Sequence, residues 1–220
     1  MRTLPLRMLW VWERREDLQS IDAGREAIAW LDRTIVLGSS TASIPRREPF
    51  VYPTGTRRIA VVRVEVVPGT RLDSQQRREA VEMLAGVAKE RGIAALQVDF
   101  DAKKSQRGFY RELLWDLRGQ MPAELPLSIT ALASWCSNDD WIGDLPVDEA
   151  VPMLFRMEPD RRRASQDQPQ FGIREPLCMG SVGVSTREAW PADMSGKRVY
   201  IFADRGWRED LPLLAERNLR

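Results

Sequence analysis

Eight short apolar runs along the chain constrain the fold more than any other feature of the sequence. Each is rich in aliphatic, β-branched or aromatic residues and gives way to charged residues, glycine or proline, which is typical of a buried strand that ends at a turn. The runs occupy residues 8–12, 27–31, 58–67, 93–101, 127–135, 150–157, 179–184 and 198–203. Eight is the number of parallel strands that closes a barrel.

Helical segments separate several of these runs. Residues 75–91 carry apolar side chains at the spacing of one helix face, and a second such face follows Ser105 and ends near Gly119. A last helix is expected over residues 211–219. The pattern predicts an α/β protein, a (β/α)8 TIM-type barrel with short or missing helices, in a single domain over residues 1–220. An open doubly wound sheet is the alternative, but no glycine-rich phosphate-binding loop accompanies the first strand.

An insertion interrupts the barrel pattern after the second strand. Residues 34–38 and 49–52 are apolar, and the residues between them are rich in serine, threonine, proline and arginine. Pro45, Pro49 and Pro53 exclude a helix here. The sequence predicts a β-hairpin made of these two short runs.

Composition excludes several classes of function. The chain has 33 basic and 32 acidic residues, so its net charge of +1 does not indicate nucleic acid as a partner. No apolar run approaches the roughly 20 residues of a membrane span, and the composition does not specify an oligomeric state. Histidine is absent, which excludes Ser–His and Cys–His nucleophile systems and most zinc sites. We therefore expect no metal and no cofactor.

The two cysteines and the amino terminus bear on the cellular compartment. Cys136 and Cys178 form no CxxC motif, and we expect both to be buried free thiols. Residues 1–7 contain no apolar core and no cleavage site of a signal peptide, which favours a cytoplasmic location. A processed start would look the same, so a periplasmic or secreted protein remains the alternative.

The run at residues 93–101 places two acids at the end of a strand. Side chains alternate along a strand, so Leu96, Val98 and Phe100 share one face and Gln97, Asp99 and Asp101 share the other. The two carboxylates then lie roughly 6.6 Å apart along the strand. Carboxylates buried without partners cost several kcal/mol each, so they must face a polar cavity, a cation or water. In barrels of this kind the site lies at the carboxyl ends of the strands.

Other strand ends supply further candidates for a site that binds a small molecule or a glycan. Glycoside hydrolysis needs two carboxylates, and indole rings stack on sugar rings. We expect Asp101 to act as the acid or base, Asp99 as its electrostatic partner, and Glu65 or Glu13 as the second carboxylate. The residues expected to contact the ligand are Trp12, Arg63, Trp135, Arg156, Asp204 and Trp207.

The whole chain resembles an uncharacterised bacterial family, domain of unknown function 3142. The resemblance is carried by residues 10–14 (WVWER), 62–65 (VRVE), 96–102 (LQVDFDA), 127–135 (LSITALASW) and 151–157 (VPMLFRM). That family has no established activity to transfer. More distantly, residues 98–101 (VDFD) look like the fourth-strand DxDxE motif of chitinase-type barrels, in which the glutamate is the general acid. Lys103 stands in the position of that glutamate.

Four interpretations of the site remain open from the sequence. The first is a glycosidase-like hydrolase, and the second is a non-catalytic carbohydrate-binding barrel, which Lys103 favours. In the third, Asp99 and Asp101 bind Mg²⁺ or Mn²⁺. In the fourth, the two acids pair with Arg63 and Arg156 in a structural ion network across the barrel mouth.

Overall fold

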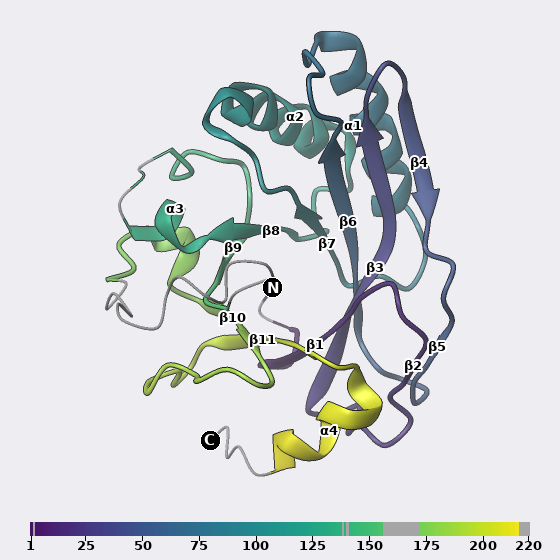
Figure 1. The fold of residues 1–220 in the computed structure, drawn as a ribbon, viewed down its shortest axis with the longest axis vertical. Coiled ribbons are helices and arrows are strands. Elements are labelled where there is room, and N and C mark those ends of the chain that lie inside the picture. The colour runs from purple at the N-terminus through teal and green to yellow at the C-terminus, as the bar shows by residue number, and fades with distance from the viewer. Residues whose placement is uncertain (2, 138, 140, 156–171, 216–220) are drawn as a thin grey trace.

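A computed structural model describes residues 1, 3–137, 139, 141–155 and 172–215 (Figure 1). Its central feature is a closed barrel of parallel strands, in which β1 pairs with both β11 and β3. The barrel strands are β1 (Arg7–Val11), β3 (Glu26–Leu37), β6 (Arg58–Val66), β7 (Ala95–Asp99), β8 (Leu127–Leu132), β9 (Glu149–Met153), β10 (Ser181–Ser185) and β11 (Arg198–Phe202). Each barrel strand pairs with the barrel strands that come before and after it in the sequence, and β1 and β11 close the ring. The predicted TIM-type barrel is confirmed, and β7 is its fourth strand.

Full helices cover only part of this barrel. The helices α1 (Ser74–Ala88) and α2 (Arg107–Gln120) lie side by side against β6 and β7 (Figure 1). Asp73 begins α1 with a capping box in which its side chain accepts the N–H groups of Gln75 and Gln76. The remaining helices are short: η1 (Lys104–Gln106), α3 (Ala133–Ser137), η3 (Pro176–Cys178) and α4 (Trp207–Ala215). The described connections β1–β3 and β10–β11 contain no helix, as the pattern predicts.

The insertion differs in detail from its prediction. The runs at 27–31 and 34–38 form one strand, β3, because a register shift between Leu31 and Arg33 lets the strand continue past an extra residue. Its second half pairs antiparallel with β4 (Thr41–Pro45). The hairpin therefore exists, but its second strand was wrongly placed at 49–52. In that region β5 (Phe50–Val51) instead pairs in parallel with β2 (Glu16–Asp17).

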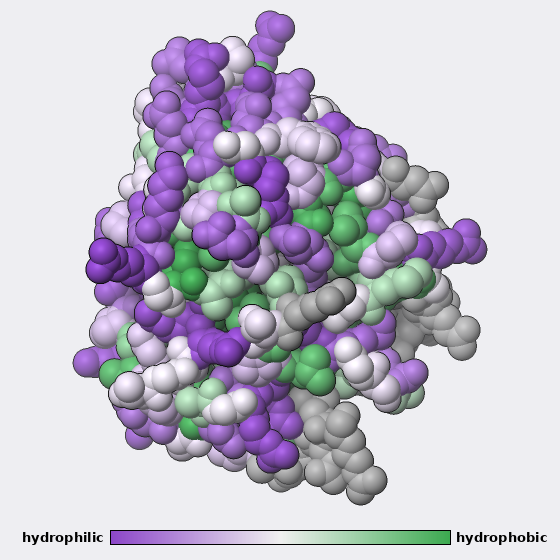
Figure 2. All heavy atoms as spheres, turned by 180° about the vertical axis from the view of Figure 1, so that it is seen from behind, coloured by the Kyte–Doolittle hydropathy of each residue, from purple (hydrophilic) through white to green (hydrophobic). Residues whose placement is uncertain are grey.

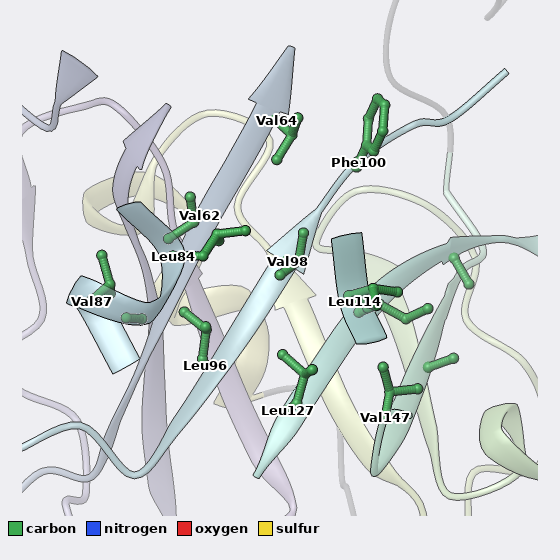
Figure 3. Close-up of a cluster of buried hydrophobic side chains, with 14 of the residues drawn as sticks. Val62, Val64, Leu84, Val87, Leu96, Val98, Phe100, Leu114, Leu127 and Val147 are labelled. Atoms are coloured by element: carbon green, nitrogen blue, oxygen red, sulfur yellow. The ribbon is translucent and has the colours of Figure 1, made fainter. Parts of the chain in front are cut away.

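Two apolar clusters lie on the two faces of the barrel wall. Outside the wall, Leu96 and Val98 of β7 pack with Leu84 of α1 and Leu114 of α2 (Figure 3). Inside the barrel, Met8, Trp10, Ile59, Val61 and Tyr200 form the second cluster. The predicted alternation of β7 is therefore confirmed, with its apolar face toward the helices. Gln97 and Asp99 lie on the inner face.

The amino-terminal end of the barrel interior is polar. Glu149 of β9 accepts hydrogen bonds from Ser128, from Tyr200 and from Arg198, at 3.2, 2.7 and 2.5 Å. Arg198 also donates to the carbonyl oxygens of Met1 and Pro5. This network joins three strands to the start of the chain.

The cysteines are bonded to each other, so the expectation of free thiols was wrong. A disulfide joins Cys136 of α3 to Cys178 of η3, whose Cα atoms lie 5.9 Å apart. The two residues are 42 positions apart, in segments that directly follow β8 and directly precede β10, and the fold brings these segments together. Sequence spacing does not reveal such a pairing.

The surface is mostly hydrophilic, with smaller hydrophobic areas, in the view of Figure 2. Across the part of the chain that the structure describes, no helix has the length and apolar character needed to span a membrane.

Candidate functional site

Asp99 is the last residue of β7 and points into the barrel near its carboxyl end. Its Oδ1 atom accepts a hydrogen bond from the Thr130 hydroxyl at 2.7 Å, and its Oδ2 atom accepts one from Arg63 at 3.1 Å. The Asp99 side chain is only 7% exposed. Arg63 and Thr130 come from the strands on either side, and Arg63 stands opposite Asp99 in the β6–β7 ladder. The carboxylate is therefore held by partners from both neighbouring strands.

Arg63 connects Asp99 to two further residues. Its Nε atom donates to Glu65 at 2.7 Å, and its guanidinium carbon lies 5.2 Å from the centre of the Trp12 ring. The Arg63 side chain remains 23% exposed, so it lies at the surface of the barrel mouth. A continuous row of contacts thus runs from Trp12 through Arg63 and Asp99 to Thr130.

Burial raises the pKa of the Asp99 carboxyl above its ordinary value. Arg63 opposes this shift, and the negative charge of Asp101 reinforces it. Burial lowers the pKa of Arg63, but Asp99 and Glu65 more than compensate, so the pKa of Arg63 lies above its ordinary value. Arg63 stays charged, and Asp99 is the member of the pair whose protonation is favoured.

Asp101 differs from Asp99 in its surroundings, although both were predicted to face one cavity. It lies two residues beyond the β6–β7 ladder, its side chain is exposed, and no described residue bonds to it. Lys103 is also exposed, at the start of η1. Nearby, the hydroxyl of the fully buried Tyr110 has no hydrogen-bond partner in the described structure. Burial, followed by the charges of Asp99 and Asp101, raises the pKa of Tyr110 well above its ordinary value.

The two acids expected as a second carboxylate are both engaged. Glu65 is half exposed and bound to Arg63. Glu13 accepts the backbone N–H groups of Arg47 and Glu48 at 3.0 and 2.9 Å, so it fastens the segment between β4 and β5. Of the four expected catalytic acids, Asp101 is therefore the one that has no bound partner among the residues described.

The expectation that Trp135 and Trp207 contact a ligand at the mouth is wrong, because both rings are buried. Trp135 is 2% exposed, because β8 ends at Leu132 and α3 turns the ring into the core against Trp141. Trp207 is fully buried, and its Nε1 atom donates to the carbonyl oxygen of Trp10 at 2.8 Å. Large apolar rings at strand ends gain more from burial than from exposure.

Other expected contacts have mixed outcomes. Trp12 is half-buried beneath Arg63. Asp204 follows β11, where its N–H donates to Thr186 and its carbonyl oxygen accepts from Arg14. Arg156 lies outside the described residues.

Sequence reasoning missed an apolar wall beside the charged row. Phe202 of β11 stacks on Phe155 with ring centres 5.4 Å apart, and Trp12 meets Phe202 at 6.4 Å. Leu132, at the end of β8, is 42% exposed. Side chains alternate between the two faces of a strand. Applied to the runs at 127–135 and 198–203, this alternation could have identified Thr130, Leu132 and Phe202 as residues that face the barrel interior.

Within the described ranges, no three His, Cys, Asp or Glu side chains form a group that could hold a metal ion. A cavity of about 1060 Å³ lies on the outer side of the barrel, between α4 and the β2–β5 pair. Its walls include Glu16, whose carboxylate is already bound to the N–H of Trp207 at the start of α4. Of the expected site residues, only Trp207 lines this cavity. The barrel mouth therefore remains the better candidate site.

Comparison with known proteins places these residues in a family context. No curated protein matches the chain. A similar solved structure is the chitinase domain of the spore coat protein CotE from Clostridium difficile, with a TM-score of 0.45 and 13% identity over 67% of this chain. The match spans 49% of that chain, about half its length. Residues 54–156, which carry β6 to β9 and hence Arg63, Asp99 and Asp101, match the model of the family described as Domain of unknown function (DUF3142), as the resemblance implies.

Proposed function

We propose that the barrel binds a carbohydrate at the carboxyl ends of its strands and does not hydrolyse it through a carboxylate pair. The observation that carries this proposal is that both carboxylate oxygens of Asp99 already accept hydrogen bonds, one from Arg63 and one from Thr130. Asp101, two residues after the end of β7, is an unpaired carboxylate among the described residues. Lys103 occupies the position of the general acid in the DxDxE motif. Hydrolysis by a carboxylate pair needs two carboxyl groups free to act on one bond.

The composition of the mouth supports a ligand with both apolar faces and hydroxyl groups. Phe202, Phe155 and Trp12 supply ring surfaces. Arg63, whose guanidinium group lies over the Trp12 ring, supplies a donor for hydroxyl groups, and the exposed Asp101 supplies an acceptor. Sugar rings combine these two surfaces.

Hydrolysis is the second candidate, and one observation favours it. Asp99 has a raised pKa beside the exposed Asp101, and an acid with an elevated pKa next to a second carboxylate is a recurring arrangement in glycosidases. In this interpretation Asp101 acts as the acid or base, and Glu65 or Glu13 must leave its present partner. That requirement makes hydrolysis the weaker candidate.

A glycan panel tested with the wild type and Asp101→Asn separates the two functions. We expect calorimetry to detect binding without release of product, and the dissociation constant to rise about tenfold or more in the variant, since a hydrogen bond to a charged group contributes about 1.5–3 kcal/mol. Glu124→Gln is the matched control, because Glu124 is an exposed acid that precedes β8 at the opposite end of the barrel. Release of product by the wild type but not by Asp101→Asn would establish hydrolysis. A wild type that binds no glycan would refute the proposal.

A further inference from the structure

The Cys136–Cys178 disulfide joins the β8–β9 connection to the last part of the β9–β10 connection. Cys136 belongs to α3, which directly follows β8, and Cys178 belongs to η3, which directly precedes β10. Both residues are buried, at 1% and 0% exposure. The bond therefore joins the β8–β9 connection to the β9–β10 connection beneath the surface.

Backbone hydrogen bonds reinforce this junction. The carbonyl oxygen of Cys136 accepts the N–H groups of Arg174 and Glu175 at 2.8 and 3.2 Å. The Glu175 carboxylate in turn accepts the N–H of Leu177 and so begins η3. Gly143, in the β8–β9 connection, approaches Glu175 so closely that an added Cβ would lie 3.0 Å from its carboxylate. The two connections are thus packed together over several residues around the disulfide.

The β8–β9 side of the junction contacts α2 and directly follows the strand that carries Thr130. Trp135, next to Cys136, packs edge-on against Trp141 with ring centres 4.8 Å apart. The carbonyl oxygen of Trp141 accepts a hydrogen bond from Arg111 of α2. On the other side, α3 follows the strand whose Thr130 holds Asp99. The disulfide therefore ties the β8–β9 connection, which contacts α2, to the segment that precedes β10.

We propose that the Cys136–Cys178 bond is a redox-sensitive clamp between the β8–β9 connection and the segment that precedes β10, and that the protein works in an oxidising compartment. Cytosolic thiol systems keep cysteines reduced, whereas extracellular and periplasmic proteins retain their disulfides. Two buried cysteines whose bond joins separate loops fit the second class. This inference replaces the expectation of a cytoplasmic location.

The redox step involves two electrons. On oxidation, the two thiols lose two protons and two electrons and form one S–S bond, while a disulfide-carrying oxidant is reduced to its dithiol by thiol–disulfide exchange. A dithiol reductant reverses the step and becomes a cyclic disulfide. Opening the bond frees a loop of 42 residues in the unfolded chain, so the reduced protein should melt roughly 10 °C lower.

The test compares the wild type with Cys136→Ser/Cys178→Ser, each with and without a dithiol reductant. In the wild type we expect no titratable thiol under denaturing conditions, a lower melting temperature on reduction, and a changed near-ultraviolet circular dichroism from the Trp135–Trp141 pair. The double variant should resemble the reduced wild type and should not respond to the reductant. If the double variant does not fold, the clamp is tested by the change in melting temperature and near-ultraviolet circular dichroism when the wild type is reduced. Two titratable thiols, or a reductant that changes neither melting temperature nor spectrum, would overturn the clamp.

A second arm tests the compartment. The chain is expressed in one bacterium with and without an export leader, and free thiols are alkylated before lysis. We expect the exported protein to be fully oxidised and the cytoplasmic protein to carry two alkylated cysteines and to melt lower. Equal melting temperatures, with both thiols free in the cytoplasmic protein, would refute the proposal.

Discussion

Arg63 controls the charge balance at the carboxyl ends of β6 and β7. It contacts Asp99 and Glu65 through hydrogen bonds and Trp12 through its guanidinium face. Asp99 has no other cation among its described partners. Loss of the arginine would therefore leave a nearly buried carboxylate with only the Thr130 hydroxyl.

Replacement of Arg63 by methionine should lower the free energy of unfolding by about 3–5 kcal/mol at neutral pH, because it leaves a buried charge without its partner. The pKa of Asp99 is already raised in the folded state, and the substitution raises it further. A group with a raised folded pKa loses its stabilising contribution as pH rises through that value, so the deficit should grow from acidic to neutral pH. Urea unfolding of the wild type and the variant at several pH values, from acidic to neutral, measures this loss of stability.

The double variant Arg63→Met/Asp99→Asn is the control for this effect. It removes the charge together with its partner, so it should recover most of the lost stability and show less dependence on pH. Equal losses in the single and double variants, at every pH, would show that the two side chains are not coupled.

At the residue scale, the sequence predicts which side chains share a face better than it predicts their surroundings. Alternation correctly places Gln97 and Asp99 inside the barrel. It does not distinguish Asp99 from Asp101, because the ladder with β6 ends at Asp99 and the chain then leaves the wall. Trp135 and Trp207 were misplaced for a related reason, since each belongs to a helix that begins just after its strand.

At the scale of elements, Asp210 fastens α4 to the barrel. Its fully buried carboxylate accepts hydrogen bonds from the Thr186 hydroxyl at 2.6 Å, from Arg187 at 3.0 Å and from the N–H of Arg205 at 3.0 Å. Burial alone would raise its pKa, but these donors outweigh burial and hold the pKa of Asp210 below its ordinary value. Two connections and a helix therefore depend on one ionised side chain.

Asp210→Asn should destabilise the protein by about 3 kcal/mol at neutral pH, because it removes charge-assisted hydrogen bonds from a buried site. A depressed folded pKa contributes stability above the unfolded value, about 3.9 for aspartate, and that stability is lost as pH falls through the folded pKa. The difference between wild type and variant should therefore shrink in acid. Glu124→Gln, at an exposed position before β8, is the control in the same denaturation series. A difference that widens in acid would contradict the role of the carboxylate.

Elements with strong internal patterns were predictable, and those that depend on tertiary pairing were not. The apolar runs identify the eight barrel strands, and the 3.6-residue pattern identifies α1 and α2. The second hairpin strand was misplaced because β4 is polar and partly exposed, so it has no apolar signal. The disulfide was missed because its two loops meet only after the barrel closes.

At the scale of the molecule, the barrel carries polar networks at both ends of its interior. The candidate site occupies the carboxyl end, around Asp99. The amino-terminal end holds Glu149 and Arg198, which join β8, β9 and β11 to the first residues of the chain. In barrels of this type, the carboxyl end is associated with ligands and the amino-terminal end with stability. The two networks can therefore be perturbed separately.

Glu149→Ala should unfold the whole barrel more easily while leaving the mouth intact. It leaves Arg198, whose side chain is 9% exposed, without its carboxylate partner, at a cost of about 3–5 kcal/mol. For a chain of this size that loss corresponds to a melting temperature about 10 °C lower. Because the network links strands from both halves of the chain, far- and near-ultraviolet circular dichroism should give the same transition.

The double variant Glu149→Leu/Arg198→Met separates the buried charge from the loss of packing. It removes both charges and keeps apolar volume, so it should be more stable than Glu149→Ala. Tyr200 and Ser128 would still lose an acceptor, so recovery should be partial. Glycan affinity should be unchanged in both variants below their melting temperatures. A loss of affinity with unchanged stability would place the ligand at the amino-terminal end and contradict the assignment of the site to the mouth.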